Sequence, residues 1–380
     1  MKHTNETPKR LESLDILRGF DLFFLVLFSS VIGKFAGAAQ SPALDSFMWN
    51  FSHVEWEGFS PWDLVMPLFM FMAGVSMPFS LNKYRGTGNK NTAVYQRIFK
   101  RFFLLWIFGM ISQGNLLGLD PDRLFLFSNT LQSIAIGYLV TALLYIHVPT
   151  KALIAYAIAS LLLFWGAMEF ITIDGYGGGN YTPDGNLAEW VDRAVLGRFR
   201  DGSSMENGVV VFSESYRYTW VLSSVNFIVT VMSGLFAGLI IRQNTSHMQK
   251  IRSLLWIGLA MIALGWLGHM AHPVIKKIWS STMTLISSGY CFLLMGVFYY
   301  AIDYKGWSKG FAWLKILGMN SIAVYMMAQV VNFRGMCHSL LYGLEQYAGD
   351  FYPVLLECGQ SACLFLILYW MYRQKIFLRV

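Results

Sequence analysis

Ten apolar segments, separated by polar connections, follow one another along almost the whole of this 380-residue chain. Each segment approaches the roughly 20 residues that an α-helix needs to cross a bilayer. A helix pairs its backbone amides and carbonyls internally, which the hydrocarbon interior of a membrane requires. The sequence therefore predicts an all-α polytopic membrane protein with about ten transmembrane helices. These helices are expected near residues 17–35, 60–82, 99–114, 125–147, 151–172, 218–241, 253–270, 277–301, 311–333 and 352–372.

The composition excludes the main soluble classes. Only 13% of the residues are charged and 55% are hydrophobic, whereas a soluble domain is usually about 25% charged. This rules out a soluble enzyme, a nucleic-acid-binding protein and a disordered chain, and makes the lipid bilayer the expected surroundings. The first apolar run lacks a small-residue cleavage site, so we expect it to stay as a helix rather than to be removed.

Lysine and arginine are unevenly distributed between alternate connections, and this predicts the orientation. One side comprises the N-terminus, residues 83–101, Lys151, residues 242–252 and 303–315, and the C-terminus. It holds 20 of the 29 basic and 5 of the 22 acidic residues, leaving 9 basic and 17 acidic on the other side. The net charges are therefore +15 and −8, which sum to +7. Both termini are predicted to be cytoplasmic, which requires an even number of spans.

Two external connections are unusually long. Residues 36–59 precede the second predicted helix, and residues 173–217 form a polar insert that is rich in glycine near Tyr176. Loops of this length in a compact protein usually carry function or are mobile. We expect residues 1–380 to form a single transmembrane domain that carries these two external segments.

The densest polar cluster lies at the outer edge, between His53 and Asp63. Pro61 suits the first turn of a helix, with Ser60 as its N-cap and Asp63 in the turn where a carboxylate is favoured. His53 lies within reach of a carboxylate that fixes its tautomer, as a general base requires. The alternative is an ordinary polar histidine in an interfacial loop.

Polar groups inside the predicted spans are also candidates, because they are costly to bury in lipid. Gln132, Asn226 and the Asn320–Ser321 pair lie in different helices and could line an internal cavity or simply bond helices together. Asp15 and Arg18 have the spacing of an ion pair within one helix. His269 and His272 have no third ligand in sequence register, so no metal site is predicted.

Arg97, Lys100 and Arg101 lie at the predicted cytoplasmic mouth. They either anchor the helix at the interface or bind the phosphates of an anionic ligand. The residues alone leave two classes of function open. One is an enzyme that uses a cytoplasmic anionic donor and an external acceptor; the other is a transporter of a small polar or sugar substrate without covalent chemistry.

Several motifs resemble those of transmembrane acyltransferases of the heparan-α-glucosaminide N-acetyltransferase family. Leu11-Glu-Ser-Leu-Asp15-Ile-Leu-Arg18-Gly19 is similar to the opening helix of that family, and His53-x-x-Trp56-x-Gly58 with Asp63-Leu-Val-x-Pro67 to its next signature. The same order continues with Thr130-Leu-Gln132, Val191-Asp192-Arg193, Ser224-x-Asn226, Gly318-Met-Asn320-Ser321-x-x-x-Tyr325 and Lys375-Ile-Phe377. The resemblance covers nearly the whole chain.

The resemblance implies transfer of an acetyl group from cytoplasmic acetyl-CoA to an amino sugar of the glucosamine type on the far side of the membrane. The donor substrate that it implies is acetyl-CoA, and it implies no metal. His53 becomes the catalytic histidine and Asp63 its supporting carboxylate, while Asn320 is the expected donor to the oxyanion. The positions implied for donor binding are Arg18, Arg97, Arg101, Gln132, Asn226 and Ser321, and those for acceptor binding are Ser29, Glu55, Trp56 and Asp192.

The chain departs from the family pattern at three positions. Ser29 stands where the family carries asparagine, Ser133 where it carries arginine, and Ala328 where it carries histidine. The identity of the acceptor, N- or O-acetylation, and direct transfer or prior acetylation of His53 all stay open. The sequence suggests a bacterial homologue in the inner membrane that faces the periplasm, and family members are often homodimers.

Overall fold

The computed structural model describes residues 11–85, 92–114, 116, 124–215 and 218–378. These residues are mostly helical, and the prediction of an all-α polytopic membrane protein is confirmed. The long or central helices are α1 (Glu12–Leu22), α2 (Ser29–Ala39), α4 (Val65–Val75), α6 (Thr92–Ser112), α7 (Thr130–His147), α8 (Thr150–Phe170), α10 (Ser224–Arg242), α11 (His247–Gly268), α12 (Ser281–Phe298), α13 (Ala312–Met319), α14 (Ser321–Val330) and α17 (Tyr352–Arg373). The shorter ones are α3 (Pro42–Met48), α5 (Met77–Ser80), α9 (Leu187–Leu196), α15 (Phe333–Leu341) and α16 (Glu345–Ala348).

Each predicted span coincides with helix in the structure. Within the described residues, eight helices are long and apolar enough to cross a membrane, or nine if the bent pair α13–α14 counts as one span. The remaining predicted span is α6, a 21-residue helix. Its N-terminal half carries Arg97, Lys100 and Arg101, which lower its hydropathy although its length suffices. Because both chain ends lie outside the described residues, their cytoplasmic location stays a prediction.

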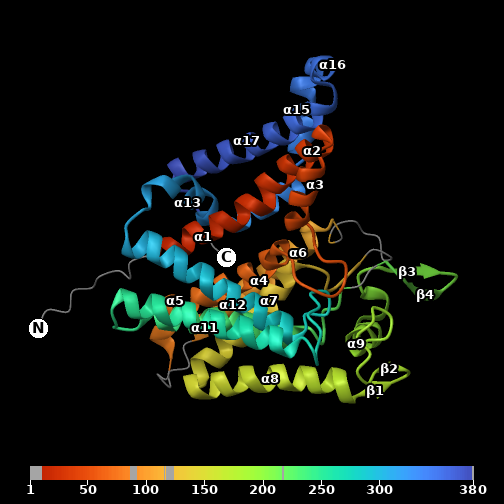
Figure 1. The fold of residues 1–380 in the computed structure, drawn as a ribbon, viewed down its shortest axis with the longest axis vertical. Helices are drawn as coiled ribbons and strands as arrows, with labels where there is room; N and C mark the ends of the chain where they lie inside the picture. Colours follow the sequence, from red (N-terminus) through yellow and green to blue (C-terminus); the bar gives the residue numbers. More distant parts are fainter. Residues whose placement is uncertain (1–10, 86–91, 115, 117–123, 216–217, 379–380) are drawn as a thin grey trace, which may run out of the picture.

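In Figure 1 helices α8 and α11 run close to horizontal, α1 and α17 run obliquely above them, and α15 and α16 extend upward at one end. Helices α4, α7 and α10 are largely buried, whereas α8, α11 and the α1–α2 rod present most of their surface to the outside. The α1–α2 rod is continuous because a π-helical segment, Phe23–Phe28, joins its two halves. Helix α10 is buried on several sides, and its polar side chains face α12 and the segment before it, where Asn226 and Thr230 bond to Trp279 and Ser233 bonds to Ser288.

Glycines allow two pairs of helices to touch through their backbones. A Cβ atom at Gly74 of α4 would lie 1.9 Å from the carbonyl oxygen of Val231 in α10. A Cβ at Gly318 of α13 would likewise lie 1.8 Å from the carbonyl oxygen of Asp15 in α1. Small residues commonly permit such close helix contacts in membranes. The Gly318 motif therefore has a packing role, because only glycine fits where α13 meets α1.

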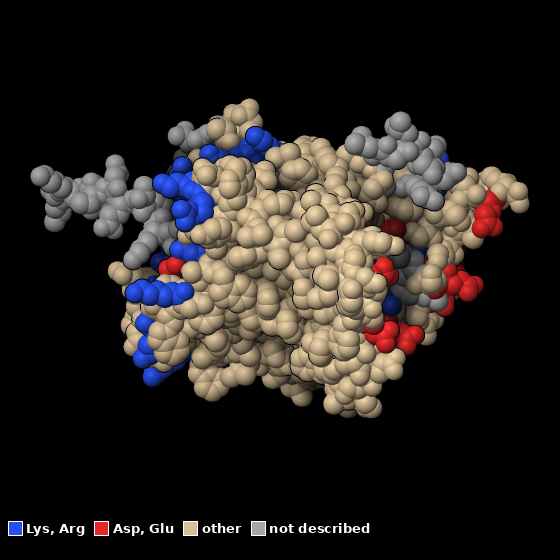
Figure 2. Space-filling view, turned by 90° about the horizontal axis from the view of Figure 1, so that it is seen from above, with Lys and Arg blue, Asp and Glu red and all other residues tan. Residues whose placement is uncertain are grey.

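Charge separates between the two ends of the helix bundle. Figure 2 shows most of the visible lysine and arginine side chains at one end and the aspartate and glutamate side chains at the other. In Figure 1 the acidic end is the one that carries α9 and the small strands. This separation along the helix axes agrees with the asymmetry counted in the sequence, and it distinguishes a basic end from an acidic end.

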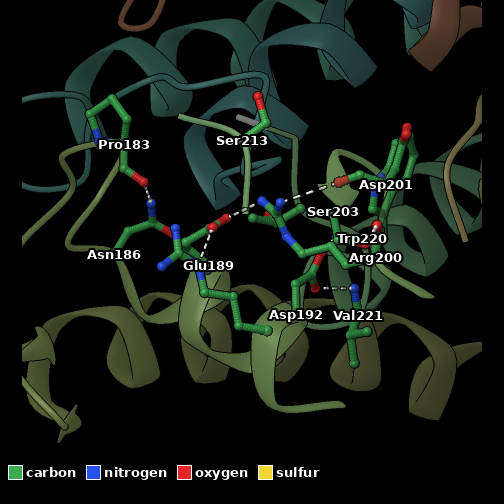
Figure 3. A network of polar contacts seen from close by, with 12 residues as sticks. Pro183, Asn186, Glu189, Asp192, Arg200, Asp201, Ser203, Ser213, Trp220 and Val221 are labelled. Carbon is green, nitrogen blue, oxygen red and sulfur yellow. Dashed lines mark hydrogen bonds and ion pairs between the residues drawn. The ribbon is translucent and has the colours of Figure 1, made fainter. Parts of the chain in front are cut away.

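The insert at residues 173–217 forms a folded layer on the acidic end; residues 216–217 lie outside the described part. It contains helix α9 and two antiparallel hairpins, β1 (Thr172–Ile173) with β2 (Tyr176–Gly177) and β3 (Ser203–Glu206) with β4 (Val209–Phe212). Figure 3 shows its buried polar network, in which Glu189 pairs with Arg200. Glu189 also pairs with Arg193, at 2.7 Å.

Candidate active site

Three charged or titratable groups meet at the acidic end of the bundle. The Nδ1 atom of His53 lies 2.8 Å from Oδ1 of Asp63, and Nζ of Lys276 lies 3.3 Å from the same oxygen. Lys276 Nζ is also 3.0 Å from His53 Nδ1. The side chains of Asp63 and Lys276 are only 1% and 8% exposed, whereas that of His53 is 41% exposed. Asp63 and Lys276 therefore form a buried ion pair, and the His53 imidazole beside them is the accessible group.

The predicted helix start positions Asp63. Ser60 is the N-cap of the helical turn Pro61–Leu64, with Pro61 at its first position and a reciprocal capping box between Ser60 and Asp63. The amide of Ser60 donates to Asp63 Oδ2 at 2.9 Å, so the second oxygen of the carboxylate is held by the backbone. Oδ1 stays directed at His53, and an Nδ1 proton donated to this oxygen would leave Nε2 as the basic atom.

Lys276 is the member of the cluster that the sequence analysis missed. It lies in the connection between α11 and α12, which bonds directly to the His53 loop: the amide of Gly58 donates to the carbonyl oxygen of Val274 at 2.8 Å. Burial lowers the pKa of Lys276 to about 8, and the neighbouring Asp63 carboxylate opposes that shift. The sequence offers only a weak signal, a lysine on the external side with its net negative charge, because the partners of Lys276 are far away along the chain.

A second histidine fixes the scaffold of this site. The backbone amide of Ser281 donates to Nε2 of His272, so the Nδ1 proton of His272 points to the hydroxyl of Tyr181, 2.9 Å away. The same Tyr181 accepts, at its carbonyl oxygen, a hydrogen bond from the indole of Trp56 at 2.9 Å. Tyr181 of the insert therefore ties the His53 loop to the connection that carries Lys276.

We expect the stability of this protein to fall as the pH drops from about 6.5 to 4. Burial lowers the pKa of His272 to about 4, whereas an unfolded histidine titrates near 6.5. Between these values the unfolded chain binds the proton that the folded chain excludes, so unfolding becomes easier by up to about 1.4 kcal/mol per pH unit. Thermal unfolding measured from pH 7 to 4 should show a shallower decline for His272→Gln than for the wild type. An identical slope in the two proteins would exclude His272 as the cause.

His53 and Lys276 line a cavity of about 370 Å³ at the acidic end. Polar groups from several elements surround it: Gln113, Ser128, Asn129, Thr130, Asp201, Tyr218, Tyr325 and Gln329. Burial and the Asp63 charge raise the pKa of Tyr218 to about 12, so its hydroxyl stays a donor at neutral pH. We call this space the histidine cavity.

The buried network of the insert supplies one wall of the histidine cavity. Asp192 accepts backbone hydrogen bonds from Trp220 at 2.8 Å and Val221 at 2.9 Å. Arg200 donates to the carbonyl oxygen of Asp201, and both Asp201 and Trp220 line the cavity. Asp192, expected from the family resemblance to contact the acceptor, is fully buried and positions Trp220 instead.

A second cavity of about 360 Å³ adjoins the first, because Phe69, Thr130 and Tyr325 line both. Its polar lining comprises Arg18, Ser76, Ser80, Arg101, Thr130, Ser321 and Tyr325, of which only the two arginines are charged. The guanidinium of Arg101 lies 4.1 Å from the centre of the Tyr138 ring, and its Nε atom is buried without a hydrogen-bond partner among the described residues. We call this space the arginine cavity; Arg97, on the same helix α6, is exposed and does not line it.

Three amides predicted to face a cavity are bound by the protein itself. Asn320 donates to the carbonyl oxygen of Ile376 at 3.1 Å and accepts from the amide of Leu378 at 3.0 Å. Gln132 accepts from the amide of Ser128 and donates to the carbonyl oxygen of Leu126, while Asn226 donates to that of Trp279 at 2.7 Å. Within the described chain, none of the three lines either cavity. The placement of Asn320 as an oxyanion donor beside His53 is therefore corrected: its amide holds the C-terminal segment.

The remaining predicted acceptor contacts lie outside the histidine cavity. Ser29 bonds to the carbonyl oxygen of Leu25 in its own helix at 3.2 Å. Glu55 is exposed, and the indole of Trp56 is engaged by Tyr181. Neither Ser29, Glu55 nor Trp56 is among the described residues that line it. The expectation that they contact the acceptor directly is not supported by this geometry.

Comparison with known proteins gives a consistent result. A family profile described as "Domain of unknown function (DUF5009)" matches residues 10–182. Heparan-alpha-glucosaminide N-acetyltransferase of Homo sapiens is 26% identical over 418 aligned positions, covering 98% of this chain. The chain resembles this enzyme over nearly its whole length. The relative of the same name from Mus musculus is 25% identical and aligns with 86% of the chain.

The chain spans only part of these N-acetyltransferases, 60% of the human and 54% of the mouse protein. The resemblance inferred from the ordered motifs is nevertheless confirmed, since both relatives carry the name that those motifs suggested.

Proposed function

We propose that this protein transfers an acetyl group from acetyl-CoA to an amino sugar of the glucosamine type across the membrane. The observation that carries the proposal is the pair of adjoining cavities. One is lined by arginines and the other by a histidine held by a buried carboxylate, and they share the wall Phe69, Thr130 and Tyr325. The names of the similar proteins support the same reaction.

The arginine cavity is the proposed donor site. Guanidinium groups suit the phosphates of CoA, because they form directed, charge-assisted hydrogen bonds. The basic end of the bundle, to which the positive-inside rule assigns the cytoplasm, is where this donor is available. The thioester would reach the shared wall between the cavities, while the acceptor would enter from the acidic end. The proposal also places the protein in the bacterial inner membrane, with its acidic end facing the periplasm. It includes assembly as a homodimer.

In the proposed reaction, His53 is the general base. Asp63 accepts a hydrogen bond from the Nδ1–H group of His53, which leaves Nε2 to take a proton from the acceptor amine as the amine nitrogen attacks the thioester carbonyl carbon. A nitrogen–carbon bond forms, the carbon–sulfur bond breaks, and the proton passes to the departing thiolate to give free CoA. The ammonium group of Lys276 stabilises the oxyanion that develops on the carbonyl oxygen, the role that Asn320 does not fill.

The proposal is tested by incubating the purified protein with acetyl-CoA and glucosamine. Release of free CoA, together with a gain of one acetyl group in the mass of the sugar, is the expected result. CoA release without acetylated sugar would point to hydrolysis or a different acceptor. If acetyl-CoA neither binds nor reacts, and the sugar instead accumulates unchanged in vesicles, the transporter function is the correct one.

We expect Arg101→Gln to raise the KM for acetyl-CoA about tenfold or more, because a hydrogen bond to a charged group is worth roughly 1.5–3 kcal/mol. The matched control is Arg97→Gln, which removes the same charge from the same helix at an exposed position. Its KM should change by a much smaller factor. Equal effects of the two variants would show that general positive charge, rather than the arginine cavity, attracts the donor.

A further inference from the structure

A third, smaller cavity opens beside the histidine cavity. Its volume is about 150 Å³, and Leu25 and Gln329 line both spaces. It lies between the α1–α2 rod, α14 and α17, and its polar groups are Ser30, Gln329, Gln360 and Ser361. Pockets that hold a whole drug-sized ligand measure roughly 300–1,000 Å³. This side pocket therefore suits one ring of a larger molecule rather than a separate substrate.

Three of the four polar residues of the side pocket have no side-chain hydrogen bond within the described chain, whereas the fourth, Gln360, donates to Glu357. The hydroxyl of Ser361 is buried without a hydrogen bond. Within the part of the chain that the structure describes, Ser30 and Gln329 have no side-chain hydrogen bond either. Polar groups on membrane-spanning helices normally find partners, because an unpaired one is costly in an apolar environment. Three helices therefore direct unused hydrogen-bonding capacity into one small space.

The side pocket is also uncharged. None of the described residues that line it is acidic or basic; apart from the four polar residues they are apolar, such as Val26, Phe333 and Leu364. Glu357 lies nearby on α17, but Gln360 donates to it at 2.6 Å and Arg334 lies 3.9 Å from it. A sulfate or carboxylate would find no countercharge here, whereas amides and hydroxyls both donate to and accept from sugar hydroxyls.

We propose that the side pocket binds a neutral, hydroxyl-bearing sugar ring linked to the amino sugar that accepts the acetyl group. The inference rests on the proposed acetyl transfer and narrows its acceptor to at least a disaccharide whose second ring carries no charge. The amino sugar would lie at His53 in the histidine cavity. The second ring would pass between Leu25 and Gln329, which line both spaces.

The test compares three acceptors at saturating acetyl-CoA: glucosamine, glucosamine linked to glucose, and glucosamine linked to glucuronate, each disaccharide in both anomeric forms. We expect kcat/KM for the better neutral disaccharide to exceed that for glucosamine about tenfold, which corresponds to one or two recovered hydrogen bonds. The glucuronate compound should be poorer than the neutral one. Equal values for all three acceptors, or a preference for the charged ring, would overturn the proposal.

Two variants locate the effect. Ser30→Val and Ser361→Val each remove a hydroxyl from the side pocket and fill part of it, so the ratio of disaccharide to monosaccharide kcat/KM should fall toward one. Ser339→Val is the matched control, because its hydroxyl bonds to the carbonyl oxygen of Gly335 within α15 and lies outside the side pocket. If the ratio of disaccharide to monosaccharide kcat/KM is unchanged in both variants, the second ring binds elsewhere.

Binding without the donor separates this inference from the proposed reaction. Trp62 and Trp220 line the histidine cavity, so their fluorescence should respond to an occupying sugar. The neutral disaccharide should bind more tightly than glucosamine in the wild type but not in Ser361→Val. If the disaccharide binds more tightly but no acetyl group is transferred, the proposed acetyltransferase activity is wrong and the proposed sugar site in the side pocket is retained. If acetyl transfer occurs but the two sugars bind equally well, the activity is retained and the proposed sugar site is wrong.

Discussion

His53→Ala is expected to lower kcat for acetyl transfer by about 10²–10⁴-fold, the usual contribution of a general base. The imidazole is the only accessible group of the His53–Asp63–Lys276 cluster within the described chain, with 41% of its side chain exposed. Its removal costs little packing, so the variant should keep the thermal stability of the wild type to within a few degrees. Initial rates of CoA release with glucosamine, together with thermal unfolding, measure both quantities.

The control for this variant is His338→Ala, which removes a histidine from α15, where its ring bonds to the Tyr352 hydroxyl at 3.0 Å. Its transfer rate should stay near that of the wild type. A wild-type rate in His53→Ala would remove His53 from the mechanism. Radiolabelled acetyl-CoA without acceptor distinguishes the two routes left open by the sequence: label retained on His53 would show prior acetylation, and its absence in an active enzyme would favour direct transfer.

Lys276→Met is expected to lower kcat by about 10²–10³-fold, the typical cost of removing one oxyanion donor. The ammonium group lies 3.0 Å from the imidazole of His53 and lines the same cavity, so it can reach the developing charge. The matched control is Lys277→Met, the adjacent lysine, whose Nζ lies 6.0 Å from the centre of the Tyr218 ring. It should retain most of the wild-type rate.

The same lysine predicts the alkaline side of the pH–rate profile. With its pKa at about 8, Lys276 is charged at lower pH and neutral at higher pH. The groups in contact with it are His53 and Asp63, and the other charged or titratable residues that line the same cavity are Asp201, Tyr218 and Tyr325. The wild-type rate should therefore fall as the pH rises through about 8. Lys276→Arg should keep its charge there and lose that decline, because arginine stays protonated; a decline at the same pH in Lys276→Arg would assign it to another group.

Removing Lys276 also leaves the buried Asp63 without its cation, which can cost about 3–5 kcal/mol of stability. The double variant Lys276→Met, Asp63→Asn removes both charges and should recover much of that stability without recovering activity. Because Asp63 also holds His53, the reference is Asp63→Asn alone: a double variant of restored stability whose rate stays well below that of Asp63→Asn assigns a catalytic role to Lys276, whereas equal rates indicate a purely structural one. Recovery of both stability and wild-type activity in the double variant would contradict the proposed oxyanion role.

The local features of this protein could be predicted from the sequence. Apolar runs of about 20 residues predict helices, because backbone pairing inside a helix depends only on neighbouring residues. The Ser60–Pro61–Asp63 start is equally local, and the structure shows the expected cap. The proximity of His53 to Asp63 follows from that turn, since only ten residues separate them.

Other assignments depended on partners that the sequence could not identify. A polar side chain in a membrane helix must find a partner, but its residue type does not indicate whether the partner is a ligand or a backbone group. Asn320 could therefore be predicted to face a cavity, whereas the structure pairs it with Ile376 and Leu378. Asp192 was likewise expected at the acceptor and instead holds the Trp220 backbone.

The sequence by itself determined the helices, the unequal charge of the two ends and the turn that holds Asp63, since each depends on composition or on residues close together in the chain. Only the tertiary structure decided that Lys276 joins His53, from which it is separated by 223 positions. It also decided that the arginine cavity and the side pocket each adjoin the histidine cavity. The physical reason is that a cavity is formed by the packing of distant helices, and no short segment encodes its shape.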